Sequence, residues 1–319
     1  MKDPLPSAAT DSLDEFRSGT DLFRILCWVA SAATVATLAW IIFEITRQAW
    51  PAISQFGVDF IAGTKWSANR GIFGVLPFII GTAVSSFIAI LFALPLGLAI
   101  AVFLSEDFLP VPVRQFIRFV VELLAAIPSV VYGLWGIFVV IPLVQEYGKI
   151  VADSLGTSIP LFKGPAFGNS MLTASLVLAL MILPTITAIS RTALVAVPRT
   201  LREGSYALGA TRWETIFRVI MPTAAPGIVA ATILALGRAM GETMAIAMLI
   251  GNSSRLTWSL FSPAGTLAGL LANEFAEAGG LQVASLMFAA LLLVVLTLGV
   301  NIVGEIVLKH TQKSTAGIR

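Results

Sequence analysis

The 319-residue sequence has few charged residues, and this shortage excludes whole classes of protein. Only 12% of its residues are charged and 57% are hydrophobic, whereas a typical soluble domain has about 25% charged and roughly 45 to 50% apolar residues. The net charge is +2, and the basic residues are scattered between apolar blocks, which argues against DNA or RNA as a partner. The composition therefore predicts an integral membrane protein surrounded by lipid.

Cysteine and histidine each occur once. Cys27 is in an apolar block, where we expect a small buried hydrophobe, and one cysteine forms neither a disulfide nor a thiolate metal site within one chain. His310 is in a polar segment without neighbours suited to metal binding or catalysis. We therefore predict no catalytic residue, no metal site and no cofactor in this chain. A membrane-embedded enzyme is disfavoured because it needs paired acid, base or metal groups.

Long apolar runs are the feature that the sequence has in abundance. A helix that crosses a bilayer needs about 20 mainly apolar residues, and six blocks qualify. Prolines inside several blocks favour a packed bundle, because neighbouring helices satisfy the freed carbonyls. The predicted fold is all-α and polytopic: a polar N-terminal tail at 1–21, a six-helix bundle within 22–309 and a C-terminal tail at 310–319, with spans at 25–45, 79–104, 119–143, 171–190, 224–250 and 284–304.

Lysine and arginine are distributed unevenly between the two sides of the predicted bundle. With the N-terminus inside, 13 of the 20 fall in inner segments, 6 fall in outer segments, and Arg238 lies within the fifth block. The positive-inside rule therefore predicts that both termini are cytoplasmic. In the last outer loop, 251–283, apolar residues at helical spacing follow Thr266 and predict a short helix on the outer face.

Two charged residues, Arg238 and Glu242, fall near the middle of the predicted fifth span. An arginine at the bilayer centre costs about 2.5 to 3.5 kcal/mol, so both charges are expected to face the protein interior or a water-filled path. Their i to i+4 spacing predicts that they share one helix face. Two interpretations remain open. The residues form a mutual ion pair, or Arg238 binds a tetrahedral oxyanion such as phosphate while Glu242 accepts a hydrogen bond from a protonated phosphate oxygen.

The loop between the fourth and fifth spans, 199–222, has an unusual order of residues. Gly209 is predicted to break a helix, and a second amphipathic helix is predicted to stop near Pro222. Gly204 and Ser205 are small enough to permit close approach by a partner. The positive-inside rule explains the arginines of this loop, but it does not explain the spacing of its small residues, glycine and proline.

This order resembles the EAA loop of binding-protein-dependent ABC importer permeases. In that family a glutamate and two small residues precede a glycine, and two aliphatic residues and a proline follow. The matching positions here are Glu203, Gly204, Ser205, Gly209, Val219, Met221 and Pro222, with Gly204 and Ser205 in place of alanines, Val219 in place of isoleucine and Met221 in place of leucine. The resemblance implies a type I ABC importer permease fold and a coupling helix that docks into an ATPase subunit.

Within the family, the chain is similar to PstC-type permeases of phosphate importers over roughly residues 21–309. The passages that carry this similarity are 73–82, 122–136 and 235–252. The resemblance implies that Arg238 and Glu242 lie in a phosphate pathway, which agrees with the argument from burial cost.

The resemblance also implies the partners and the location of the chain. The expected partners are a second, PstA-like permease, an ATPase dimer that carries ATP and Mg, and a soluble phosphate-binding protein, all at the inner membrane of a prokaryote. Two alternatives stay open: a permease for another oxyanion or a phosphonate, and an ATP-independent secondary transporter or channel. The latter needs its own coupling-ion site, such as intramembrane carboxylates beyond Glu242.

Overall fold

The computed structural model describes residues 7–106, 108–156 and 159–316. In this part of the chain, six helical segments are long and apolar enough to cross a membrane, as the sequence predicted. They are Phe23–Ala62, Leu76–Ser105, Ser129–Ser154, Met171–Val195, Arg212–Gly241 and Leu281–Gln312.

The long helices are α1 Ser7–Ala62, α2 Leu76–Ser105, α6 Met171–Val195, α9 Met221–Gly241 and α12 Leu281–Ala316. The shorter helices are α3 Val111–Ala126, α4 Ser129–Trp135, α5 Ile141–Leu155, α7 Arg199–Ala207, α8 Arg212–Thr215, α10 Met244–Leu249 and α11 Leu267–Glu274. Two π-helical turns, Gly136–Val140 and Ile216–Ile220, continue α4 into α5 and α8 into α9. Short 3-10 turns are Ala68–Arg70, Pro160–Phe162 and Phe275–Glu277, and strands β1 Trp66–Ser67 and β2 Ile72–Phe73 pair antiparallel.

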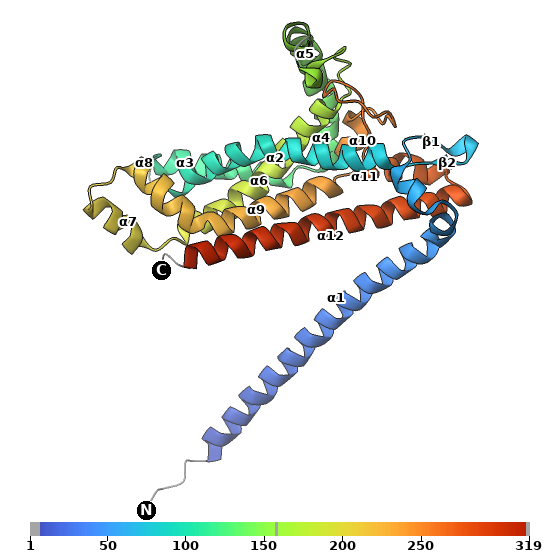
Figure 1. The fold of residues 1–319 in the computed structure, drawn as a ribbon. Coiled ribbons are helices and arrows are strands. Elements are labelled where there is room, and N and C mark those ends of the chain that lie inside the picture. Colours follow the sequence, from blue (N-terminus) through green and yellow to red (C-terminus); the bar gives the residue numbers. More distant parts are fainter. Residues whose placement is uncertain (1–6, 107, 157–158, 317–319) are drawn as a thin grey trace, which may run out of the picture.

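Four long helices form the centre of the molecule. Helix α6 lies between α2 and α9, and α9 packs in turn against α12, so that the four lie side by side in Figure 1. The largest buried cluster gathers around α6 and includes Val177, Ile182 and Ile186. Helix α6 is therefore the most enclosed of the six spans, with 67% of its most apolar window buried. The start of α1 and the end of α12 both lie toward the end that carries α7 and α8 (Figure 1).

Helix α1 diverges from this bundle along most of its length (Figure 1). It contacts α12 through its C-terminal part, where Ala49, Ala52 and Phe60 are buried and Phe60 stacks on Phe288 with ring centroids 4.5 Å apart. The helix already begins at Ser7, inside the segment predicted to be a polar tail, and residues 1–6 lie outside the description. The prediction that Cys27 is buried was wrong, because its helix is uncovered there and the thiol is exposed.

The third predicted span, 119–143, was wrong as a single helix. The chain bends at Ile127, which precedes Pro128 and adopts an extended conformation with φ −69° and ψ 126°. The proline ring disfavours the helical conformation for the residue before it, so α3 ends there and α4 starts afresh. Beyond the bend, α4 packs against α10, and α5 then points away from the bundle axis (Figure 1).

The short helix predicted after Thr266 is confirmed as α11. Thr266 caps it, since its side-chain oxygen accepts a hydrogen bond from the backbone N–H of Gly269 at 3.1 Å. Its first residues Leu267, Ala268 and Leu270 are buried against α2 and α12. The helix therefore closes the end of the bundle opposite α7 and α8.

Candidate functional site

The loop predicted to be a coupling element folds as two short helices joined by a tight turn. Helix α7 ends at Ala207, and Gly209 has φ +83°, a left-handed conformation that terminates helices and favours glycine. Helix α8 begins with a capping box, in which Thr211 and Glu214 bond reciprocally through side chains and backbone N–H groups. Ser205 and Thr215 then join the two helices through their hydroxyl groups at 3.0 Å. The predicted break at Gly209 is confirmed.

An ion pair ties this helical hairpin to the bundle. Arg202 of α7 pairs through Nη1 with a carboxylate oxygen of Glu106, which directly follows α2. The Nη2 group of Arg202 donates to the carbonyl of Leu194 in α6 at 2.7 Å. The two side chains are only 17% and 14% exposed. One guanidinium therefore holds the C-terminal ends of α2 and α6 beside α7.

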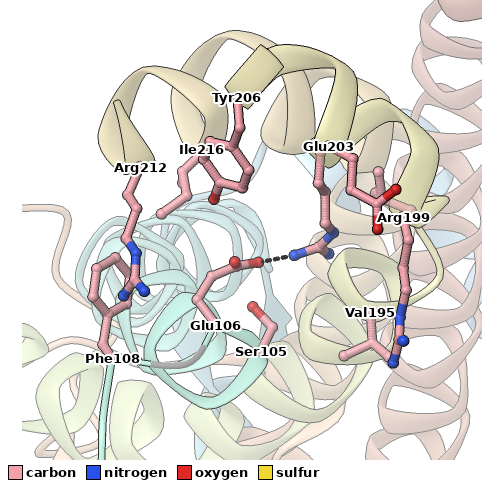
Figure 2. A pocket seen from close by; sticks show the side chains of 11 residues that line it. Ser105, Glu106, Phe108, Val195, Arg199, Glu203, Tyr206, Arg212 and Ile216 are labelled. Atoms are coloured by element: carbon pink, nitrogen blue, oxygen red, sulfur yellow. Dashed lines mark hydrogen bonds and ion pairs between the residues drawn. The ribbon is translucent and has the colours of Figure 1, made fainter. Parts of the chain in front are cut away.

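Aromatic rings make a second connection between the hairpin and the α2–α3 segment. Phe108 stacks on Trp213 of α8 with ring centroids 5.1 Å apart, and Trp213 stacks on Phe217 at 5.9 Å. The guanidinium of Arg212 lies 5.9 Å from the centre of the Phe108 ring, within the range of a cation–π contact. Figure 2 shows Phe108 and Arg212 on one side of the cavity and Arg199 on the other.

The ion pair and the Phe108 ring border a cavity of about 550 Å³ between the end of α2 and the hairpin. In Figure 2, Glu106 points across this cavity toward α7, and a dashed line joins its carboxylate to a guanidinium. Its lining residues come from the end of α2, the segments that follow α2 and α6, the end of α6, α7, α8 and the π-helical turn after α8: Ser105, Glu106, Phe108, Val195, Val197, Arg199, Arg202, Glu203, Tyr206, Arg212 and Ile216.

The predicted coupling residues occupy two places in this region. Glu203, Gly204 and Ser205 lie in the middle of α7, and a methyl group added at Gly204 meets nothing within 4 Å. Val219 is in the π-helical turn, while Met221 and Pro222 begin α9. The prediction that the second helix stops at Pro222 was wrong. The proline is the second residue of α9, and the preceding π-helical turn carries the chain from α8 through the proline into α9 without a break.

The prediction that Arg238 and Glu242 share one helix face was also wrong. Helix α9 ends at Gly241, and Glu242 has an extended conformation with φ −67° and ψ 126°. The predicted span 224–250 is thus two helices, α9 and α10, with a break after Gly241. Within the described residues no ion pair joins Arg238 to Glu242. Hydropathy does not register a break in the backbone, so the sequence predicted one continuous helix here.

The two residues have separate neighbours. Arg238 is exposed in the last turn of α9, and its Nη1 donates to the hydroxyl of Thr185 in α6 at 3.3 Å. Glu242 is half-buried and accepts a hydrogen bond from the N–H of Ala245 in α10 at 3.4 Å. A helical rise of about 1.5 Å per residue places Arg238 roughly 25 Å along α9 from Met221. The guanidinium and the hairpin are therefore distinct regions of the molecule.

Several residues at these sites carried no distinctive sequence signal. Arg202 counted only toward the charge bias of the inner loops, and Glu106 lies 96 positions away from it. Phe108 and Thr185 stood in or beside apolar blocks like many other residues. Opposite charges near the inner ends of two predicted spans are the one available hint, and that hint does not select a partner.

The family of the chain follows from comparison with known proteins. Residues 93–316 match the family described as binding-protein-dependent transport system inner membrane component. The chain belongs to this family. It is a polytopic, all-α membrane protein, and the EAA-like hairpin of this inner membrane component lies within the matched residues.

Relatives are similar to this inner membrane component along nearly its whole length. The phosphate transport system permease protein PstC of Haemophilus influenzae is 41% identical over 303 residues and covers 94% of both chains. The protein of the same name from Mesorhizobium japonicum is 40% identical over 307 residues, 91% of this chain and 94% of the relative.

Solved structures show the same fold. A chain of a bacterial alginate ABC transporter, in complex with an alginate pentasaccharide-bound periplasmic protein, has a TM-score of 0.59 at 14% identity and covers 89% of this chain and 94% of its own. A chain of the inward-facing MetNI methionine ABC transporter has a TM-score of 0.52 at 22% identity over 77% of this chain and 96% of its own. The fold of this inner membrane component is that of type I ABC importer permeases.

Proposed function

We propose that this chain is the permease subunit of an ATP-driven importer that carries inorganic phosphate across the inner membrane. The observation that carries the proposal is the similarity to phosphate transport system permeases, at 41% and 40% identity over more than nine-tenths of the chain. Similarity of this kind extends over the helices as well as the hairpin. It therefore favours phosphate over another oxyanion or a phosphonate.

The hairpin α7–α8 is proposed to bind an ATPase subunit, which holds ATP and Mg. This proposal is supported by a surface of the hairpin that no other part of the described chain covers. Leu208 at the tip is 90% exposed, Glu203 is exposed, and Gly204 has free space around it. An exposed apolar tip beside a small residue suits insertion into a groove of another protein. An ATP-independent transporter has no use for such a surface.

Arg238 and Glu242 are proposed to act on phosphate in the pathway, each from its own position instead of as a pair. Arg238 is exposed and has a single hydroxyl, from Thr185, as its hydrogen-bonding partner among the described residues. A guanidinium of this kind retains donors for a tetrahedral oxyanion. Glu242 accepts a hydrogen bond from a protonated phosphate oxygen, which sulfate at neutral pH does not provide.

The transport cycle follows from these two regions. A soluble phosphate-binding protein docks on the outer loops, and two ATPase subunits close on ATP and draw together the hairpins of this chain and of a second, PstA-like permease. The pathway then opens outward, and Arg238 offsets the desolvation of the released anion. When the ATPases separate, the pathway opens inward and phosphate leaves to the cytoplasm.

The test is radiolabelled phosphate uptake in cells that express the complete set of importer genes, at matched membrane expression. Arg238→Ala is expected to reduce uptake at least tenfold, because a hydrogen bond to a charged group is worth about 1.5 to 3 kcal/mol. Arg47→Ala is the matched control, since Arg47 pairs with Glu44 on the exposed surface of α1.

Two outcomes contradict the proposal in different ways. If cells with the native chain take up sulfate or a phosphonate but no phosphate, phosphate is refuted as the substrate. If cells with Arg238→Ala take up phosphate as fast as cells with the native chain, only the proposed role of Arg238 is refuted, and the proposed substrate stands.

A further inference from the structure

The attachment of α7 to the bundle is concentrated in a small number of side chains. Helix α7 is short, and the structure describes none of its residues as fully buried. A helix of about two and a half turns has little stability of its own. Its orientation therefore depends on what holds it to the neighbouring helices.

Arg202 is the residue of α7 that reaches both long neighbours. Its guanidinium binds the Glu106 carboxylate at the end of α2 with one nitrogen and the Leu194 carbonyl near the end of α6 with another. Arginine presents its donors in a rigid planar fork, so two simultaneous bonds fix the direction of the side chain. A change in the tilt of α7 is thus passed to both helices.

The surroundings make the loss of one partner costlier for this ion pair than for an ordinary surface pair. Its side chains are 17% and 14% exposed, whereas those of Glu305 and Lys309 on α12 are 61% and 66% exposed. Removal of one partner from a buried pair leaves an uncompensated charge, while exposed pairs within one helix contribute little. Phe108, whose ring stacks on Trp213, lines the same cavity.

We propose that Arg202 and Glu106 are positioning residues for energy coupling: their ion pair transmits movement of the ATPase-bound hairpin to α2 and α6. This inference rests on the proposed function, since it assumes that an ATPase moves α7 and α8. The proposal assigns the transmission of movement to the contact between α7 and the α2–α3 segment. Neither residue of this contact is one of the EAA-like positions. The cavity beside the pair gives the hairpin room to move when the ion pair is absent.

The experiment uses the complete transporter reconstituted in vesicles, with Glu106→Gln, Arg202→Gln and the double variant. We measure phosphate transported per ATP hydrolysed, co-purification of the ATPase, and hydrogen exchange of the α7 amides by mass spectrometry. Glu106→Gln is expected to retain the ATPase and ATP hydrolysis, to lower the transport ratio about tenfold, and to speed α7 exchange, since contacts that link two sites modulate the coupling between them. Glu305→Gln is the control and should change none of the three readouts.

The double variant tests whether the two residues act as one unit. A shared role predicts a loss no larger than that of either single variant, whereas independent roles predict losses that multiply. Unchanged α7 exchange or an unchanged transport ratio in Glu106→Gln overturns the proposal, as does loss of the ATPase together with transport. If the native complex transports no phosphate, the proposed function fails and α7 exchange alone decides the inference.

Discussion

At the scale of single residues, two glycines in the same hairpin have opposite requirements. Gly209 has φ +83°, which an L side chain adopts only with strain, although a methyl group there meets nothing within 4 Å. Gly204 lies inside α7 with ordinary helical geometry and equally open surroundings. The need for glycine at position 209 comes from the backbone of this chain, whereas at position 204 the chain itself imposes none.

The first prediction compares alanine at these two positions. Gly209→Ala should destabilise the turn by about 1 to 2 kcal/mol, the cost of a left-handed alanine, and should reduce the ATPase that co-purifies with the chain. Gly204→Ala should leave the fold of α7 intact or stabilise it slightly, because alanine is the better helix former. Equal retention of the ATPase by both variants contradicts the argument.

Residue-scale contacts were the least predictable part of the molecule. The order of residues from Glu203 to Pro222 identified the hairpin, but not the arginine that fastens it. Nothing local links Arg202 to Glu106, since the pairing exists only once α2 and α7 have met. The shared helix face predicted for Arg238 and Glu242 failed for the reverse reason, because a local rule was applied across a helix end.

At the scale of elements, close packing of α2 requires a position without a side chain. A methyl group at Gly81 stands only 2.0 Å from the carbonyl oxygen of Gly265, in the segment that leads into α11. A backbone atom cannot rotate away as a flexible side chain does. The approach of α2 to this segment therefore depends on glycine at position 81.

The prediction for this contact is a loss of stability. Gly81→Ala should destabilise the protein by about 1 to 3 kcal/mol, as overpacking does in well-packed cores, and should lower the midpoint of thermal unfolding of the purified chain in detergent. Gly299→Ala on α12 is the matched control, since a methyl group there meets nothing within 4 Å. An unfolding midpoint of Gly81→Ala that equals or exceeds the midpoint of Gly299→Ala contradicts this prediction.

Elements were predictable in number but less so in shape. Each span needs an apolar run of bilayer length, so six runs led to six spans. Bends within a run leave hydropathy unchanged, and both the bend at Ile127 and the break after Gly241 were missed. The first had a usable signal, because Pro128 restricts the residue before it. The break after Gly241 has no such signal, since glutamate and threonine, the types of residue at positions 242 and 243, also occur inside helices.

At the scale of the whole molecule, the six spans bring the start of α1 and the end of α12 toward the same end as the hairpin (Figure 1). The excess of lysine and arginine in the predicted inner segments, 13 against 6, predicts that this end is cytoplasmic. An ATPase in the cytoplasm meets α7 and α8 only in this orientation.

The last prediction follows from this orientation. Green fluorescent protein fused to either terminus should fluoresce, since it folds in the cytoplasm, while alkaline phosphatase inserted after Gly164 should be active, since it folds outside. The same phosphatase at the C-terminus should be inactive. Phosphatase activity at the C-terminus would mean that the orientation is the opposite of the predicted one. In that case a cytoplasmic ATPase could not reach α7 and α8.

The divergence of α1 has a practical consequence for labelling the native molecule. The single thiol of the chain, Cys27, is exposed on the uncovered part of this helix. A maleimide fluorophore has only this thiol to react with, so any label that attaches lies at one known position without an engineered cysteine. Its emission reports whether water, acyl chains or a neighbouring polypeptide surrounds the first span, and assembly of the transporter becomes observable in real time from a wild-type sequence.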